Sequence, residues 1–554
     1  MKLHIITGCA LLAASMSLMS CSDFLDETPK GKLTPSTYFS TQDELNMSLN
    51  SLYTIVTQSQ IYTNMQYPQW QGDDITANPG SNKQACREID QFAVSDNQKG
   101  VRDAWNAHYT IIKAANYIID NAERTPTSQD EINIALGQAK FWRAYAYYYL
   151  VRLYGPLPLI LHNVDDNNQT QLSSVADVYK QIVQDLTDCD NYNLPASYSG
   201  QPRNINGCDV FVTQHAVKST LASVYLSMAG YPLNLGKEYY AKAATMAKQV
   251  IDGVESGKYD AKLNSEWKEV YSYGNNYNKE TILGINFSPT KNWSTDSELS
   301  SCNLFESHKG WGDGIGEIKF WMDFPEGPRK DAVYSPKLRY EVKTKDSDGN
   351  DKTSVVFYDW WQVDENGKAL VPEQQPEFCV FTINAENGKE VAAPYDYTKA
   401  PYTGMCTDTR HQLIRYSEVL LWYAEATARS GGDLTLAKKY LKTVRSRAVN
   451  AADVNTVDGV SIDAMTADQL ATAAWKEHGW EVAGYWVALA TRRSDEFRMN
   501  HLKENFAYRA ANAPVTIQGV KVQEKVPVTG SWNDNMNYLP YPSTEVEKNP
   551  NLKR

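Results

Sequence analysis

The sequence lacks a long hydrophobic run beyond its first twenty residues. A membrane-spanning helix needs about 20 consecutive apolar residues, so the rest of the chain is not expected to cross a bilayer as a helix. Runs of lysine and arginine are absent too, and the 554-residue chain carries a formal net charge of -12. Because proteins that bind nucleic acid usually present a basic face, we expect no nucleic-acid partner.

The sequence also lacks the short motifs that mark common catalytic and metal sites. It contains no GxSxG, no glycine-rich phosphate loop, no HExxH and no CxxC. The segment Lys345–Asp351 resembles a calcium loop, but Asp351 and Phe357 stand where such a loop needs glycine and glutamate. We therefore expect no metal, no cofactor and no enzyme, and a polar turn between strands at this segment. An all-α glycosidase with two catalytic carboxylates stays open, since it needs none of these motifs.

The N-terminus has the pattern of a lipoprotein signal. Lys2 precedes an apolar core that extends from Ile5 to Met19, which predicts a signal peptide over residues 1–20. Small and apolar residues then lead directly to Cys21, as in the bacterial lipobox, so we expect lipidation of Cys21. The alternative is an ordinary signal peptide followed by an incidental cysteine.

The six cysteines after Cys21 are widely spaced. Cys189 and Cys208 flank a loop rich in proline, glycine and asparagine, and they are the only plausible close pair. An exported protein can form disulfides, but buried thiols are an equally good interpretation.

Helical apolar spacing recurs along two parts of the chain. The predicted helices are 102–123, 128–154, 174–190, 211–230, 236–253, 412–430, 434–449 and 467–494. Ser128 and Ser174 are expected to begin helices, and Gly230, Gly253 and Gly431 to end them. Small residues are spaced alike in the pairs 211–230/236–253 and 412–430/434–449, which indicates degenerate tetratricopeptide hairpins.

Residues 254–410 lose this helical periodicity. Glycine, asparagine, aspartate and proline interrupt the segment, and strand-like runs are limited to stretches such as Val355–Tyr358 and Cys379–Ile383. Six of the fourteen tryptophans fall here: Trp267, Trp293, Trp311, Trp321, Trp360 and Trp361. Loops on a rigid scaffold often carry function, so this insertion is the expected binding region.

Four segments resemble, in order, the SusD/RagB nutrient-binding outer-membrane lipoproteins of Bacteroidota. They are FLDETPKGKLTPSTYF (Phe24–Phe39), AKFWRAYAYYYLVRLYGPLPLI (Ala139–Ile160), RYSEVLLWYAEATARSGG (Arg415–Gly432) with VRSRA (Val444–Ala448), and YLPYPSTEVEKNPNL (Tyr538–Leu552). One departure is Tyr485, which stands where the family's pattern has arginine and calls a local salt-bridge network into question.

The resemblance implies a mainly α SusD-like fold. Residues 21–554 would form one domain, with the helical scaffold over about 40–253 and 411–500 and the ligand-binding insertion over about 254–410. It also implies a non-catalytic protein on the outer membrane, lipid-anchored and exposed at the cell surface. Such proteins cover a SusC-like TonB-dependent transporter and deliver glycans to it, or peptides in the RagB branch.

The chemistry of sugars suggests where a glycan would bind. Sugar C–H patches stack on aromatic rings, and hydroxyls pair with carboxylates, amides and guanidinium groups. Two loop regions offer such groups, which gives the candidate site Trp311, Trp293, Trp70, Asp73, Asp74, Arg87 and Asn78. For each tryptophan the alternative is burial in the core, and for the two aspartates it is a solvated turn.

Overall fold

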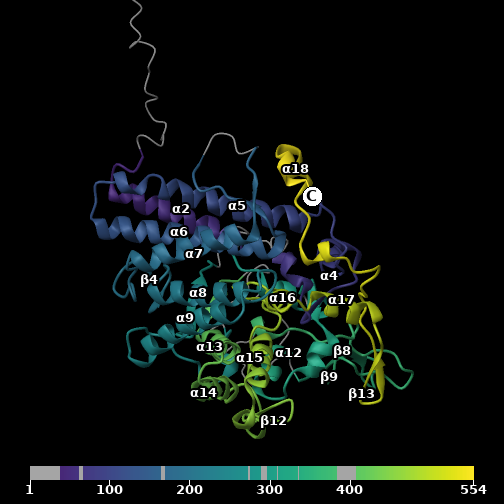
Figure 1. The fold of residues 1–554 in the computed structure, drawn as a ribbon. Helices are drawn as coiled ribbons and strands as arrows, with labels where there is room; N and C mark the ends of the chain where they lie inside the picture. Colours follow the sequence, from purple (N-terminus) through teal and green to yellow (C-terminus); the bar gives the residue numbers. More distant parts are fainter. Residues whose placement is uncertain are drawn as a thin grey trace, which may run out of the picture.

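The computed structural model describes residues 38–61, 66–163, 169–272, 275–288, 296–308, 310–334, 336–382 and 407–553. Within them the chain is mainly helical, as predicted, and its long helices stack in chain order, each packing on the next (Figure 1). The stack consists of α2 (Gln42–Gln58), α5 (Lys99–Ile119), α6 (Gln129–Tyr154), α7 (Val175–Asn191), α8 (Gln214–Ala229), α9 (Lys237–Glu255), α13 (Tyr416–Ser430), α14 (Leu434–Arg445) and α15 (Ala467–Glu481).

The two predicted helical hairpins are α8–α9 and α13–α14. Their small residues Ala222, Ala243, Ala424 and Ala437 are all buried, which lets the helix backbones approach closely. Helix α9 packs directly on α13. The two hairpins are therefore neighbours in space, although the insertion separates them in the sequence.

The predicted helix boundaries hold where the capping chemistry is local. The side chains of Ser128 and Ser174 accept hydrogen bonds from the N–H groups of Glu131 and Asp177 and cap α6 and α7. Gly431 ends α13 with a φ of +74°. The expectation that Gly253 ends a helix is wrong, because α9 continues to Glu255. Gly253 instead makes room for the Tyr259 ring, which would lie 2.2 Å from a Cβ at this position.

The predicted helix 467–494 is wrong in its second half. Helix α15 ends at Glu481, and α16 begins only at Arg492 and extends to Arg498. Gly484 lies between them with a φ of +66°, and the Phe378 ring fills the space next to its Cα. The start of the predicted helix 412–430 is also wrong, since β10 (His411–Arg415) precedes α13.

Strands in the described residues form two-stranded antiparallel pairs. The pairs are β1 (Ile75–Ala77) with β7 (Gly314–Gly316), β2 (Leu157–Pro158) with β3 (Leu172–Ser173), β4 (Asn204–Ile205) with β5 (Cys208–Asp209), β6 (Thr281–Ile285) with β10, β8 (Leu338–Lys345) with β9 (Asp351–Tyr358), β11 (Thr456–Val457) with β12 (Val460–Ser461), and β13 (Val515–Ile517) with β14 (Val520–Val522). The predicted strand Val355–Tyr358 belongs to β9, and the polar turn at Asp346 joins β8 to β9 as expected.

The predicted strand Cys379–Ile383 is wrong for its described residues, because Val380–Thr382 form a 3₁₀ turn.

Shorter α-helices complete the described fold. They are α4 (Gln84–Asp90), α10 (Leu299–Asn303), α11 (Ile318–Asp323), α12 (Pro328–Tyr334), α17 (Leu502–Ala511) and α18 (Ser543–Lys548). None of the described helices is long and apolar enough to cross a membrane.

A buried network of charges joins the insertion to the helical stack. Glu481 on α15 accepts hydrogen bonds from Arg329, Arg415 and Arg447, at 2.8, 2.9 and 3.1 Å. Burial alone would raise the pKa of Glu481, but the three guanidinium groups outweigh it and hold the pKa well below its ordinary value. An extensive ion-pair network therefore forms even though Tyr485 replaces the expected arginine.

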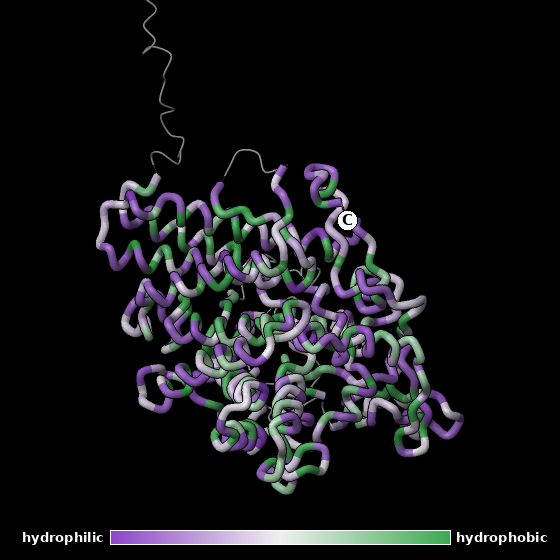
Figure 2. Tube along the Cα trace, in the orientation of Figure 1, coloured by the Kyte–Doolittle hydropathy of each residue, from purple (hydrophilic) through white to green (hydrophobic). Residues whose placement is uncertain are grey.

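The main hydrophobic core extends along the helical stack, whose surface helices alternate between hydrophobic and hydrophilic residues (Figure 2).

Cys189 and Cys208 do not form the disulfide that was one of two interpretations. Both are buried thiols, and their Sγ atoms contact the carbonyl oxygens of Gly137 and Asn278 instead.

Candidate functional site

A short antiparallel ladder brings the two predicted binding loops together. Strand β1 follows the first loop and pairs with β7 of the insertion, with Ala77 opposite Gly314. The ladder continues one step further, because the N–H of Asn78 donates to the carbonyl oxygen of Asp313 at 3.1 Å. Asn78 and the segment Trp311–Asp313 therefore meet at one end of the ladder.

Backbone hydrogen bonds to the α10 region fix Trp311. Its N–H donates to the carbonyl oxygen of Ser301 at 2.6 Å, and the N–H of Gly312 donates to that of Leu304 at 2.7 Å. A Cβ at Gly310 would lie 2.1 Å from the Leu304 carbonyl oxygen, so only glycine permits this approach. The Trp311 side chain is left half-buried.

Gly312 brings the two loops into contact. Its φ is +59°, and a Cβ there would lie 3.2 Å from Nδ2 of Asn78 and 3.3 Å from the backbone nitrogen of Glu306. The Asn78 amide and Glu306 therefore flank the residue that follows Trp311. The Glu306 side chain is 59% exposed, which leaves its carboxylate open to a ligand.

The buried carboxylate of Asp313 ties this end of the ladder to neighbouring side chains. Asp313 accepts hydrogen bonds from Lys83 Nζ at 2.5 Å and from the Tyr67 hydroxyl at 3.1 Å. Lys83 Nζ also lies 3.9 Å from the Glu306 carboxylate. Sequence reasoning missed Lys83 and Glu306, because neither belongs to a motif and only the strand pairing brings them to Trp311.

Arg87 and Asn78 shape the loop that contacts Gly312, the residue after Trp311. Arg87 Nη1 donates to the carbonyl oxygens of Pro79 and Gly80 at 2.9 and 2.8 Å, and Asn78 Oδ1 accepts from the Gly80 N–H at 2.8 Å. Both side chains remain partly exposed. We call Asn78, Lys83, Arg87, Glu306 and Trp311 the Trp311 site.

The expectation that Trp70 offers an open ring face is wrong. Its side chain is fully buried, packs against Tyr67 and Trp486, and lies beneath Gly314 of β7. A buried ring cannot stack on a sugar in this conformation. Trp70 instead fills the core under the ladder, as the alternative interpretation had it.

Asp73 and Asp74 lie at the opposite end of β1 from Asn78. Asp74 and Asn78 are four positions apart in extended backbone, a span of about 13 Å. Asp74 is buried, and its carboxylate accepts from the Gly484 N–H at 2.7 Å. Burial, and then the neighbouring Asp73, raise the pKa of Asp74 to about 7. Asp73 pairs with Arg492 through both carboxylate oxygens, at 2.5 and 2.8 Å. The grouping of these aspartates with Trp311 is therefore wrong.

Two further predicted residues lie outside the described part of the chain. Trp293 falls in 289–295, and Cys21 precedes residue 38 with the predicted signal peptide. The roles proposed for both residues stay predictions.

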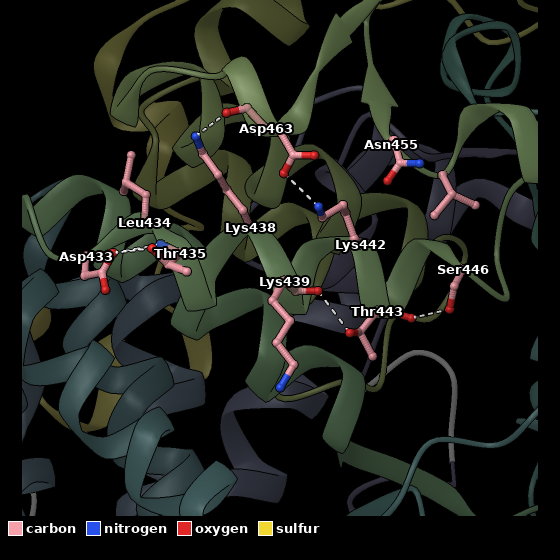
Figure 3. Close-up of a pocket in the computed structure, with 11 residues that line it drawn as sticks. Asp433, Leu434, Thr435, Lys438, Lys439, Lys442, Thr443, Ser446, Asn455 and Asp463 are labelled. Atoms are coloured by element: carbon pink, nitrogen blue, oxygen red, sulfur yellow. Dashed lines mark hydrogen bonds and ion pairs between the residues drawn. The ribbon is translucent and has the colours of Figure 1, made fainter.

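A cavity of about 810 Å³ lies on α14 (Figure 3). Its lysines already have partners, since Lys438 and Lys442 bind the carbonyl oxygen and carboxylate of Asp463 at 2.8 and 2.7 Å. Among the described residues, no aromatic side chain lines it. It therefore lacks the stacking ring that the Trp311 site offers to a sugar. In the described residues, no three or more His, Cys, Asp or Glu side chains form a group that could hold a metal ion.

Two family models match most of the chain. Residues 23–226 match a family described as "Starch-binding associating with outer membrane", and residues 279–554 match the SusD family. SusD-like protein P2 from Formosa agariphila is 25% identical over 81% of this chain and 82% of its own length. A SusD-like protein from Bacteroides ovatus is 27% identical over 58% of this chain and 55% of its own length.

Solved structures share the fold along nearly the whole chain. A SusD superfamily protein from Parabacteroides distasonis has a TM-score of 0.67 at 19% identity, with 94% of this chain and 98% of that one covered. A laminarin-binding SusD-like protein has a TM-score of 0.65 at 18% identity, with 92% and 98% covered. Together with the two family models, this fold shows that the chain belongs to the SusD/RagB family.

Proposed function

We propose that this chain is a lipid-anchored surface protein that captures glycans and delivers them to a SusC-like TonB-dependent transporter. The observation that carries the proposal is the pairing of β1 with β7, which brings a half-buried tryptophan, an amide, a guanidinium group and an exposed carboxylate to one place. This combination suits the two kinds of surface that a sugar presents.

In the proposed complex the Trp311 ring stacks on the C–H face of a sugar. The Asn78 amide and the Glu306 carboxylate, which flank Gly312, bind hydroxyl groups at the edge of that ring. Arg87 holds the loop and offers its remaining N–H groups. Trp293 is proposed as a second stacking ring.

The solved relatives support a glycan as the ligand. One structure with a TM-score of 0.67 and 19% identity is described as a complex with a xylogluco-oligosaccharide, and another protein as laminarin-binding. The first family model is described as starch-binding and associating with the outer membrane. These ligands differ, so the glycan of this chain is left to experiment.

The proposed location rests on the N-terminal sequence and on the family. Lipidation of Cys21 would anchor the chain to the outer membrane, because several acyl chains together give firm anchoring. The Trp311 site would then face ligands outside the cell, with the transporter beneath.

A binding screen of residues 22–554 against a panel of starch, fructan, hemicellulose and host glycans tests the proposal. Affinity electrophoresis should show retardation by at least one glycan, with no shortening of that glycan on prolonged incubation. Steady hydrolysis would instead indicate the glycosidase. Retardation by none of the glycans, together with binding of peptides, would indicate a RagB-type ligand and overturn the proposal.

A further inference from the structure

A second cavity, of about 330 Å³, lies at the other end of β1 from the Trp311 site. It is bordered by α11, α15, α16 and α17 and by the loop before β1. Its size falls at the small end of the range of about 300–1,000 Å³ that is typical of ligand sites. Its walls include three aromatic rings, those of Phe320, Trp475 and Tyr508.

Among the described residues, three buried residues of this cavity each have one polar atom without a hydrogen-bond partner, and one of these atoms, Oε1 of Glu496, is instead ion-paired with Arg492 at 2.5 Å. The other two are Nε1 of Trp475, whose residue is 7% exposed, and Oε1 of Glu317, whose residue is 2% exposed. The other carboxylate oxygen of Glu317 is used, since it accepts from the Phe320 N–H at 2.6 Å. Leaving a buried polar group without a partner is unfavourable, so both atoms are candidates to bind a ligand in the cavity.

The remaining charged groups of the cavity largely neutralise one another. Arg492 pairs with Asp73 and, at 2.5 Å, with Glu496. The same guanidinium group lies over the Trp475 ring, 4.3 Å from its centroid, so that face of the ring is occupied. Lys319 pairs with Asp323 near the mouth, where Tyr508 is 37% exposed.

One of the two unpartnered atoms requires a hydrogen-bond acceptor and the other requires a donor, and this difference selects the ligand. The indole N–H is a donor only, whereas a carboxyl oxygen accepts. A metal ion or an ammonium group would satisfy Glu317 and leave the Trp475 N–H unpaired. An anion would satisfy Trp475 but would leave the acceptor oxygen of Glu317 unpaired, because a fully ionised anion has no hydrogen to donate. A hydroxyl group both donates and accepts, so it satisfies either partner.

The burial of Glu317 also favours a hydroxyl group over a cation. Burial, and then the nearby Glu524, raise the pKa of Glu317 well above its ordinary value. A raised pKa means that burial disfavours the charged carboxylate, so Glu317 is better matched by a neutral hydroxyl group, which can donate a hydrogen bond to it.

We propose that this cavity is a second ligand site, which binds a single polyhydroxylated ring, such as one sugar unit, between Trp475, Glu317 and Tyr508. The site is independent of the Trp311 site, because the length of β1 separates the two. A chain with both sites could hold one glycan at two points or two sugars at once.

Fluorine NMR of the full soluble chain labelled with 5-fluorotryptophan tests the proposal directly. The resonance that disappears in Trp475→Phe belongs to Trp475. We expect it to shift when glucose, galactose or mannose is added singly, and to keep shifting in Trp311→Ala. Trp475→Phe keeps an aromatic ring but removes the N–H donor, and it should weaken this binding about threefold to tenfold. Trp360→Phe is the matched control, since Trp360 Nε1 is also buried without a partner but lies outside the cavity.

Three results would overturn the inference. The Trp475 resonance could fail to respond to every sugar, it could respond instead to ammonium chloride or sodium sulfate, or Trp475→Phe could bind the sugar as well as the wild type. None of these results touches the proposed function, which is tested separately by the glycan screen and by Trp311→Ala. Glu317→Gln keeps the acceptor and should retain the response.

Discussion

The N–H of Asn78 donates to the carbonyl oxygen of Asp313 at 3.1 Å and thereby joins two loops that are far apart in the sequence. One loop follows α2, and the other lies within the insertion. Because β1 and β7 have only three residues each, the contacts at the ends of this ladder decide which side chains meet. Asn78 meets Gly312 and Asp313 at one end, and Asp73 lines the second cavity at the other.

Replacing Gly312 by alanine should weaken glycan binding at the Trp311 site. The new Cβ would meet Asn78 and Glu306, and the left-handed backbone at φ +59° adds strain of about 1–2 kcal/mol. Gly349→Ala is the matched control, because its φ is +83° but a Cβ there meets nothing within 4 Å. Calorimetric titration should show at least a fivefold loss of affinity for the first variant alone. Equal affinities in both variants would show that the Asn78 contact does not matter.

Glu481→Gln should destabilise the fold by about 3–5 kcal/mol, because it leaves three buried arginines without a full counter-charge. The control is Glu341→Gln, whose carboxylate is 53% exposed and pairs with Arg339 at 3.2 Å. That surface pair should contribute less than about 1 kcal/mol. Urea unfolding followed by circular dichroism measures both, and similar losses would contradict a central role for the network.

His478 should make stability fall as the pH rises. Its Nδ1 lies 2.5 Å from Asp495 and its Nε2 lies 3.2 Å from Glu418. Burial alone would lower the pKa of His478, but the two carboxylates outweigh it and raise the pKa to about 9. Since the folded pKa exceeds the unfolded value of about 6.5, the stabilisation is complete below pH 6.5 and is lost as the pH rises through 9.

The expected fall in unfolding free energy over this interval is about 3 kcal/mol for the wild type. His478→Gln should remove most of this slope, whereas His162→Gln should not, because the His162 side chain is 74% exposed. Urea titrations at pH 6.5, 7.5 and 9 provide the comparison. Parallel pH dependences in wild type and His478→Gln would refute the assignment.

Cys21→Ser should release the full-length chain from the outer membrane. The thiol of Cys21 is the predicted attachment point for the lipid, and Cys9 in the same signal segment is not. Cys9→Ser is therefore the control and should leave the chain in the membrane fraction. Fractionation with immunoblotting in a Bacteroidota host reports the result, and retention of Cys21→Ser on the membrane would contradict the predicted anchor.

The sequence predicts the helical stack well, because helical periodicity and caps such as Ser128 and Ser174 are local signals. It fails where tertiary packing overrides them. The helix predicted across Gly484 is interrupted because the Phe378 ring, distant in the sequence, packs on that glycine. The strand predicted from Cys379 is absent from its described residues for a similar reason. The Cys379 N–H donates to the carbonyl oxygen of Val333, and a 3₁₀ turn follows.

The candidate site could be predicted only in part. Glycines around Trp311 pointed to a tight loop, and Asn78 and Arg87 were found because they are polar and close to aromatic residues in the sequence. Burial of Trp70 and the position of Asp74 depend on which strand pairs with β1, and no local pattern contains that. Lys83 and Glu306 reach the Trp311 site only through the same pairing.

The most direct test of the central claim is calorimetric titration of the glycan retained in the screen into wild type, Trp311→Ala and Trp532→Ala. Trp532 is also half-buried but packs on Phe92 and Phe506, away from the Trp311 site. We expect Trp311→Ala to weaken binding about tenfold or more, equivalent to about 1.4 kcal/mol, and Trp532→Ala to bind like wild type. Unchanged affinity in Trp311→Ala would contradict the proposed Trp311 site.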